Sequence, residues 1–127
     1  MFKVVLIGVG GFIGSISRYL LGGYVQEVSN SSGFPYGTMA VNLMGCFMIG
    51  LLSQLAESRG VFPSEIRSLI FIGVLGGFTT FSSFGNETMN LFRGGQMLSA
   101  LGNISANVIL GLFLVWLGRT IAYLLWR

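Results

Sequence analysis

The sequence predicts an all-α integral membrane protein with four transmembrane helices, the third of which is broken. Of its 127 residues, 53% are hydrophobic and only 9% are charged, whereas soluble domains carry roughly 25% charged residues. About 20 apolar residues span a bilayer, so this length leaves room for about four helices joined by short loops. The break is indicated by the run Gly73–Gly85, which places glycines and hydroxyls at bilayer depth. We expect one channel domain over residues 1–127, with spans at residues 2–24, 36–56, 64–92 and 96–123.

The composition excludes several classes of function. The chain has no histidine and one cysteine, Cys46, so it predicts neither a zinc or copper site nor an internal disulfide. Its net charge of +3 is not gathered in a basic cluster, which argues against nucleic-acid binding. The acids are far apart in the sequence and do not support catalysis, so we expect no enzyme: Glu27, Glu57, Glu65 and Glu87. Lys3 precedes an apolar run, but no small-x-small cleavage site follows, so we expect the first segment to be retained.

The first two spans carry small residues and isolated polar ones. Gly10 and Gly14 lie four residues apart, which lets another helix approach closely. Arg18 lies in the first span; it either faces protein or water, or reaches the membrane surface with its long side chain. The second span carries a strongly polar side chain, Asn42. Its amide either bonds a neighbouring helix or directs N–H groups at an anion path.

The third span, residues 64–92, is too long for one straight crossing, and the glycine run explains the excess as two half-helices. We expect the first half to end at Gly76–Gly77, where glycine permits a positive φ. The second half then begins at Thr79 or Thr80, both acceptable N-caps. The ends of broken membrane helices bind ions, carbonyls taking cations and N–H groups anions. The carbonyls of Gly76 and Thr79 are therefore candidates for a small hard cation, and a symmetric dimer would double their number.

The residues after the break favour a small anion. Phe81 and Phe84 are three apart and share a helix face, and the edge of a phenyl ring is positive. Ser82 and Ser83 lie between them and supply hydroxyl donors. Glu87 follows near the end of the span, where it either caps a pore entrance or sits at the membrane interface.

The fourth span has a polar face. Four residues recur every fourth position and face a partner helix or an aqueous path: Ser99, Asn103, Asn107 and Gly111. The loop charges are asymmetric, because the N-terminal side collects Lys3, Arg59, Arg67, Arg119 and Arg127. This favours a cytoplasmic N-terminus only mildly, so insertion in both orientations stays open.

Three motifs resemble the Fluc fluoride channels, also called CrcB proteins. They are GGFIGSISRYLLG (Gly10–Gly22), YGTMAVNLMGCFMIG (Tyr36–Gly50) and GGFTTFSSFGNET (Gly76–Thr88). The resemblance implies a four-helix subunit that forms an antiparallel, dual-topology homodimer in a prokaryotic inner membrane. It implies two fluoride pores along the dimer interface, through which cytoplasmic fluoride leaves passively. The choice of fluoride rests on this resemblance, since the residues alone predict a small anion.

The resemblance also implies roles for individual residues. A structural sodium ion, which is not transported, is held by the carbonyls of Gly76 and Thr79. The pore positions of the family fall on Asn42, Phe81, Phe84, Ser82, Ser83 and Asn107. Arg18 and Glu87 match positions at a vestibule or pore entrance. Three residues depart from the family pattern: Gly85 stands where many relatives have Ser, Asn103 where some have Tyr, and Gly111 where some have Ser.

Two other functions remain as alternatives. A small multidrug exporter is also a four-helix, dual-topology dimer, but that class needs a membrane-embedded acid in its first helix, and this span has none. A non-transporting assembly subunit would use the polar faces only to pack helices, and the purified protein would then move no ions.

Overall fold

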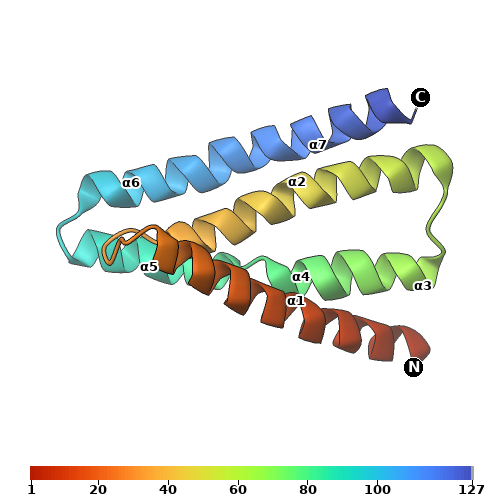
Figure 1. Cartoon of the computed structure of the whole chain (residues 1–127), viewed down its shortest axis with the longest axis horizontal. Coiled ribbons are helices and arrows are strands. Elements are labelled where there is room, and N and C mark those ends of the chain that lie inside the picture. The colour runs from red at the N-terminus through yellow and green to blue at the C-terminus, as the bar shows by residue number, and fades with distance from the viewer. Residues whose placement is uncertain (127) are drawn as a thin grey trace.

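The computed structural model describes residues 1–126 and is helical almost throughout (Figure 1). Arg127, one of the basic residues used to predict the topology, lies outside the described residues. The helices, including two π-helical segments (η), are α1 (Phe2–Val28), α2 (Tyr36–Arg59), α3 (Ser64–Arg67), η1 (Ser68–Val74), α4 (Leu75–Phe78), α5 (Phe81–Arg93), α6 (Met97–Ser105), η2 (Ala106–Leu110) and α7 (Gly111–Leu125). They form four units long and apolar enough to cross a membrane: Phe2–Val28, Tyr36–Arg59, Ser64–Arg93 and Met97–Leu125. The prediction of an all-helical protein with four such helices is confirmed.

The four units run back and forth, so that both ends of the described chain lie at the same end of the molecule (Figure 1). Helix α2 packs along α7, and α1 packs along η1 and α4. At the end that holds both chain ends, Arg119 of α7 pairs with Glu57 of α2 at 2.9 Å. The connection after α1 and the turn after α5 lie at the opposite end.

Most large apolar side chains point outward. The buried hydrophobic residues among those described are few: Val41, Ala56, Leu75, Phe78, Leu91, Ala100 and Ala122. Large apolar side chains such as Phe12, Leu20 and Leu112 are more than 60% exposed. Lipid tails are as apolar as these side chains, so this distribution suits helices packed in a bilayer through small residues.

Glycines hold α1 against the first half of the third span. Gly10 and Gly14 are buried, and a Cβ at Gly10 would lie 2.5 Å from the carbonyl oxygen of Leu69. A Cβ at Gly77 would lie 2.7 Å from the carbonyl oxygen of Gly11. The small-residue face predicted on the first span is therefore confirmed as a helix-packing face.

The break lies slightly later than predicted. Helix α4 continues to Phe78, Thr79 and Thr80 are extended (φ −88°, ψ 155° and φ −148°, ψ 115°), and α5 begins at Phe81. The prediction that a glycine at Gly76–Gly77 ends the first half with a positive φ is wrong. Among residues 1–126, the glycines with positive φ are Gly60 and Gly95. The physical reason is that Gly73 and Gly77 serve close approach to α1, whose backbone lies within 3 Å of any Cβ placed there.

Candidate ion pathway at the helix break

Two side chains cap the ends of the broken helix. The backbone N–H of Thr80 donates to Oδ1 of Asn42 at 2.9 Å, and the N–H of Ser83 donates to Oγ1 of Thr80 at 3.2 Å. In an unbroken α-helix these two N–H groups would bond the carbonyls of Gly76 and Thr79, four residues earlier. The caps therefore release the two carbonyls that the sequence singled out for a cation.

Gly76 and Thr79 line a cavity of about 380 Å³ beside the break. Its walls come from the second, third and fourth spans: Asn42, Gly45, Cys46, Ile49, Phe71, Leu75, Gly76, Thr79, Thr80, Phe81, Phe84, Asn107 and Val108. Most of these side chains are apolar, and the polar atoms are concentrated at Asn42, Asn107 and the break. A mostly apolar cavity with a few convergent polar groups is the usual form of a small-ligand site.

The first turn of α5 gathers rings and hydroxyls. The rings of Phe81 and Phe84 have their centroids 5.5 Å apart with planes inclined by 54°. Phe81 is 82% exposed, so one of its faces has no neighbour within this chain. The hydroxyl of Thr80 donates to that of Ser83 at 3.1 Å and lies 3.4 Å from that of Ser82. The structure thus brings these candidate residues together in one helical turn.

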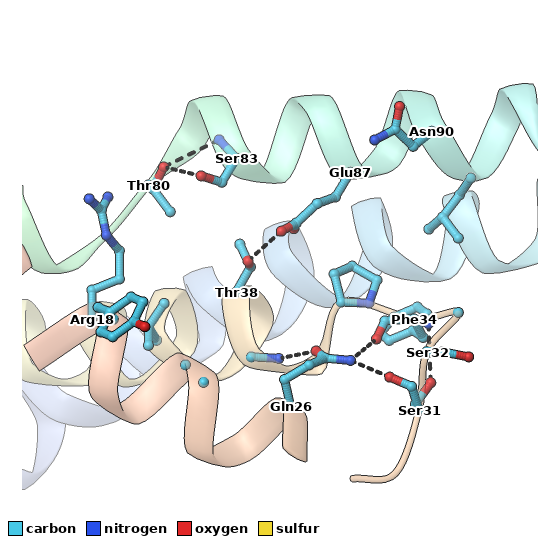
Figure 2. Close-up of a pocket in the computed structure, with 18 of the residues that line it drawn as sticks. Arg18, Gln26, Ser31, Ser32, Phe34, Thr38, Thr80, Ser83, Glu87 and Asn90 are labelled. Carbon is cyan, nitrogen blue, oxygen red and sulfur yellow. Dashed lines mark hydrogen bonds between the residues drawn. The ribbon is translucent and has the colours of Figure 1, made fainter. Parts of the chain in front are cut away.

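A second cavity, of about 710 Å³, lies on the other side of that turn and contains Arg18 and Glu87 (Figure 2). Thr80 and Ser83 also line it, and Thr80 borders both cavities. The Thr38 hydroxyl donates to Oε1 of Glu87 at 2.7 Å. Oε2 of Glu87 is buried with no hydrogen-bond partner among the described residues. Arg18 therefore faces a cavity within the protein, and Glu87 is tied to α2.

Two residues at this cavity were not predicted from the sequence. Thr38 lies four residues before Asn42, on the same face of α2, and that spacing was the available signal. Gln26 has no such signal, because its partners lie in the following loop and at the start of α2. Its amide donates to the carbonyls of Ser31 and Phe34 and accepts from the N–H of Gly37 at 3.0 Å (Figure 2).

The polar residues of the fourth span separate into two kinds. Asn107 lines the smaller cavity, and its Oδ1 accepts from the Asn42 amide at 3.2 Å. Asn103 is 1% exposed and donates to the Thr88 hydroxyl at 3.0 Å, so it faces α5. Gly111 is buried beside Cys46, whose sulfur would lie 3.3 Å from a Cβ there. The sequence left open whether this face contacts a partner helix or an aqueous path, and Asn103 and Gly111 contact neighbouring helices.

Comparison with known proteins shows the family of this chain. Residues 5–119 match the sequence model of a family described as "CrcB-like protein, Camphor Resistance (CrcB)". Fluoride-specific ion channel FluC 1 of Methanosarcina acetivorans is 43% identical over 119 residues, covering 94% of this chain and 89% of the relative. FluC of Methylobacillus flagellatus is 44% identical, covering 93% and 92%. FluC of Elusimicrobium minutum is 47% identical, covering 89% and 87%. The chain is therefore a multi-pass membrane protein that belongs to the CrcB/FluC family.

Proposed function

We propose that this protein is a fluoride-specific ion channel of a prokaryotic inner membrane, through which cytoplasmic fluoride leaves passively. The observation that carries the proposal is the turn after the break. There, two phenyl rings border a small, mostly apolar cavity, and the hydroxyl of Thr80, which also lines it, bonds that of Ser83, which lines the larger cavity. The relatives with full-length similarity are named fluoride-specific channels, which selects fluoride among small anions.

The pore uses weak donors in place of full charges. The positive ring edges of Phe81 and Phe84 face the narrow part, and the hydroxyls of Ser82 and Ser83 replace part of the water shell of the ion. Asn42 and Asn107 complete the polar side of the cavity. Because no charged side chain among the described residues lines this cavity, the pore binds fluoride weakly enough to release it, as conduction requires.

The larger cavity serves as the vestibule. Arg18 raises the local anion concentration there by its charge, since a charged cleft with low-dielectric walls focuses the field. Glu87 stands at the inner side of the vestibule, held by Thr38. Ser83, which lines the vestibule and follows the break, leads from this cavity to the rings.

A structural sodium ion fits the released carbonyls of Gly76 and Thr79. Both residues line the smaller cavity, and sodium is a hard cation that prefers oxygen ligands. The ion supplies a fixed positive charge at the break and is not transported. One subunit offers two such carbonyls, fewer than a full oxygen shell, so a second copy must contribute the rest.

The channel therefore works as an antiparallel, dual-topology homodimer, with the broken helices meeting at its axis. The exposed Phe81 ring and the open side of the smaller cavity form the surface available to the partner. The basic residues at the two ends favour one orientation only mildly, which suits insertion in both.

Efflux from liposomes tests the proposal directly. Purified protein is reconstituted with sodium present, vesicles are loaded with fluoride or with chloride, and release is followed with ion-selective electrodes. We expect fast release of fluoride and none of chloride. Release of neither ion by folded, dimeric protein would favour a non-transporting subunit, and release of both would remove the selectivity.

A further inference from the structure

A continuous chain of side-chain hydrogen bonds runs from the break to the fourth span and back to α5. Asn42 donates to the carbonyl of Thr80 and to Oδ1 of Asn107, both at 3.2 Å. Asn107 donates to the backbone carbonyl and to Oδ1 of Asn103, at 2.9 and 3.0 Å. Asn103 donates to the hydroxyl of Thr88, which donates to the carbonyl of Phe84 at 2.7 Å. We call Asn42, Asn107, Asn103 and Thr88 the amide relay.

Backbone groups fix the direction of every bond in the relay. The N–H of Thr80 can only donate and its carbonyl can only accept, so the Asn42 amide has one orientation. Asn42 then donates an N–H to Asn107, which must accept it with its side-chain oxygen. Asn107 in turn directs its nitrogen at the backbone carbonyl of Asn103. At the far end the Thr88 hydroxyl gives its proton to the carbonyl of Phe84 and receives the Asn103 N–H.

This direction leaves no spare donor on the two amides at the cavity. A primary amide has two N–H groups, and both are used on Asn42 and on Asn107. Asn107 presents its oxygen, not an N–H, to the Asn42 side of the cavity. Asn103 lines neither cavity and is 1% exposed, so it acts on the pathway only through Asn107.

We propose that Asn103 is a positioning residue: together with Thr88 it keeps the Asn107 oxygen toward Asn42 and thereby holds Asn42 against the backbone of Thr80. The inference rests on the proposed function only in assigning an ion pathway to the break. Without the Asn103 oxygen, Asn107 keeps only its bond to the backbone carbonyl of Asn103, so its amide is held less firmly toward Asn42. Asn42 then loses an acceptor, and the capped geometry at Thr80 loosens.

The relay predicts a set of coupled effects on fluoride efflux per dimer. Asn103→Leu and Thr88→Val each lower efflux roughly two- to tenfold, the range expected for the loss of one hydrogen bond. Thr88→Ser keeps the hydroxyl and stays near the unmodified rate. The double variant Asn103→Leu/Thr88→Val is no slower than the slower single variant, because both changes interrupt the same relay.

Thr120→Val is the matched control. Thr120 lies in α7 and donates to the carbonyl of Trp116 at 2.9 Å, the same local bond that Thr88 makes to Phe84, but it belongs to no relay. We expect its efflux to be unchanged. Each variant is first shown by size-exclusion chromatography to have the same dimer fraction, and Thr88→Ser against Thr88→Val keeps the test valid if Asn103→Leu does not fold.

Hydrogen–deuterium exchange at the Thr80 amide gives a readout that does not need conduction. Exchange rises in Asn103→Leu and Thr88→Val and stays at the unmodified level in Thr88→Ser and Thr120→Val. Unchanged exchange in both relay variants, or effects on efflux that multiply in the double variant, would overturn the positioning role. Absence of efflux from the unmodified protein would instead overturn the proposed function, and the exchange pattern would still decide the relay.

Discussion

Replacing Asn42 by leucine should destabilise the protein more than any other single polar-to-apolar change in α2. Leucine has a similar size, but it leaves the N–H and the carbonyl of Thr80 without their partner. Thr80 is only 9% exposed, so these groups are largely shielded from water. An unpaired buried polar group costs about 1–3 kcal/mol, and two such groups give about 2–6 kcal/mol. We expect the lower half of that range, because closing the break would return the Thr80 N–H to the carbonyl of Gly76.

The free energy of unfolding is measured by titrating the protein with sodium dodecyl sulfate in mixed micelles. Gln54→Leu is the matched control, since Gln54 lies in the same helix about three turns further on. Substitutions outside specific contacts usually stay within about 0.5 kcal/mol, and we expect this of Gln54→Leu.

An equal effect of the two substitutions would refute the reasoning. It would mean that the Thr80 backbone finds other partners and that Asn42 does not hold the break open. A large loss of stability in Asn42→Leu with efflux still dependent on sodium would show instead that the break survives without its amide cap.

Three further changes have defined outcomes. Gly10→Ala places a methyl group 2.5 Å from a backbone carbonyl and should lower the free energy of unfolding by about 1–3 kcal/mol, whereas Gly8→Ala, which meets open space, should not. Gln26→Leu removes the side chain that ties the loop after α1, so amide exchange in residues 31–37 should speed up; equal exchange would contradict that role. Replacing Phe81 and Phe84 by leucine should suppress fluoride efflux while dimers persist, and unchanged efflux would refute the ring-edge mechanism.

Local chemistry made much of this fold predictable. Long apolar segments mark the four helices, and Thr80 at the break is a recognisable cap because an N-cap acts on a residue three positions away. The glycines were misread in part. Gly77 was expected to adopt a positive φ, whereas it stays helical and lets α1 approach. Glycine serves both purposes, and only the neighbouring helix decides between them.

The site was predictable as a list of residues but not as a set of directed bonds. Asn42 and Asn107 were recognised as polar residues at bilayer depth, and both line the smaller cavity. Periodicity places a side chain on a face, but it does not say which end of an amide points where. That direction is set by Thr80, a residue 38 positions away in the chain.

The two caps of the break come from different spans, and this determines which spans must pack before each carbonyl is released. The Thr80 hydroxyl caps α5 from within the same turn, so that half is formed wherever the third span folds. The Thr80 N–H is capped only when α2 delivers Asn42, whose amide also donates to the Thr80 carbonyl and to Asn107 of the fourth span. Release of the Gly76 carbonyl therefore requires the second and third spans to be packed together, whereas release of the Thr79 carbonyl requires only the third. An incompletely packed subunit would keep the Gly76 carbonyl in its helix, so it would offer a sodium ion half of the oxygens that a packed subunit offers.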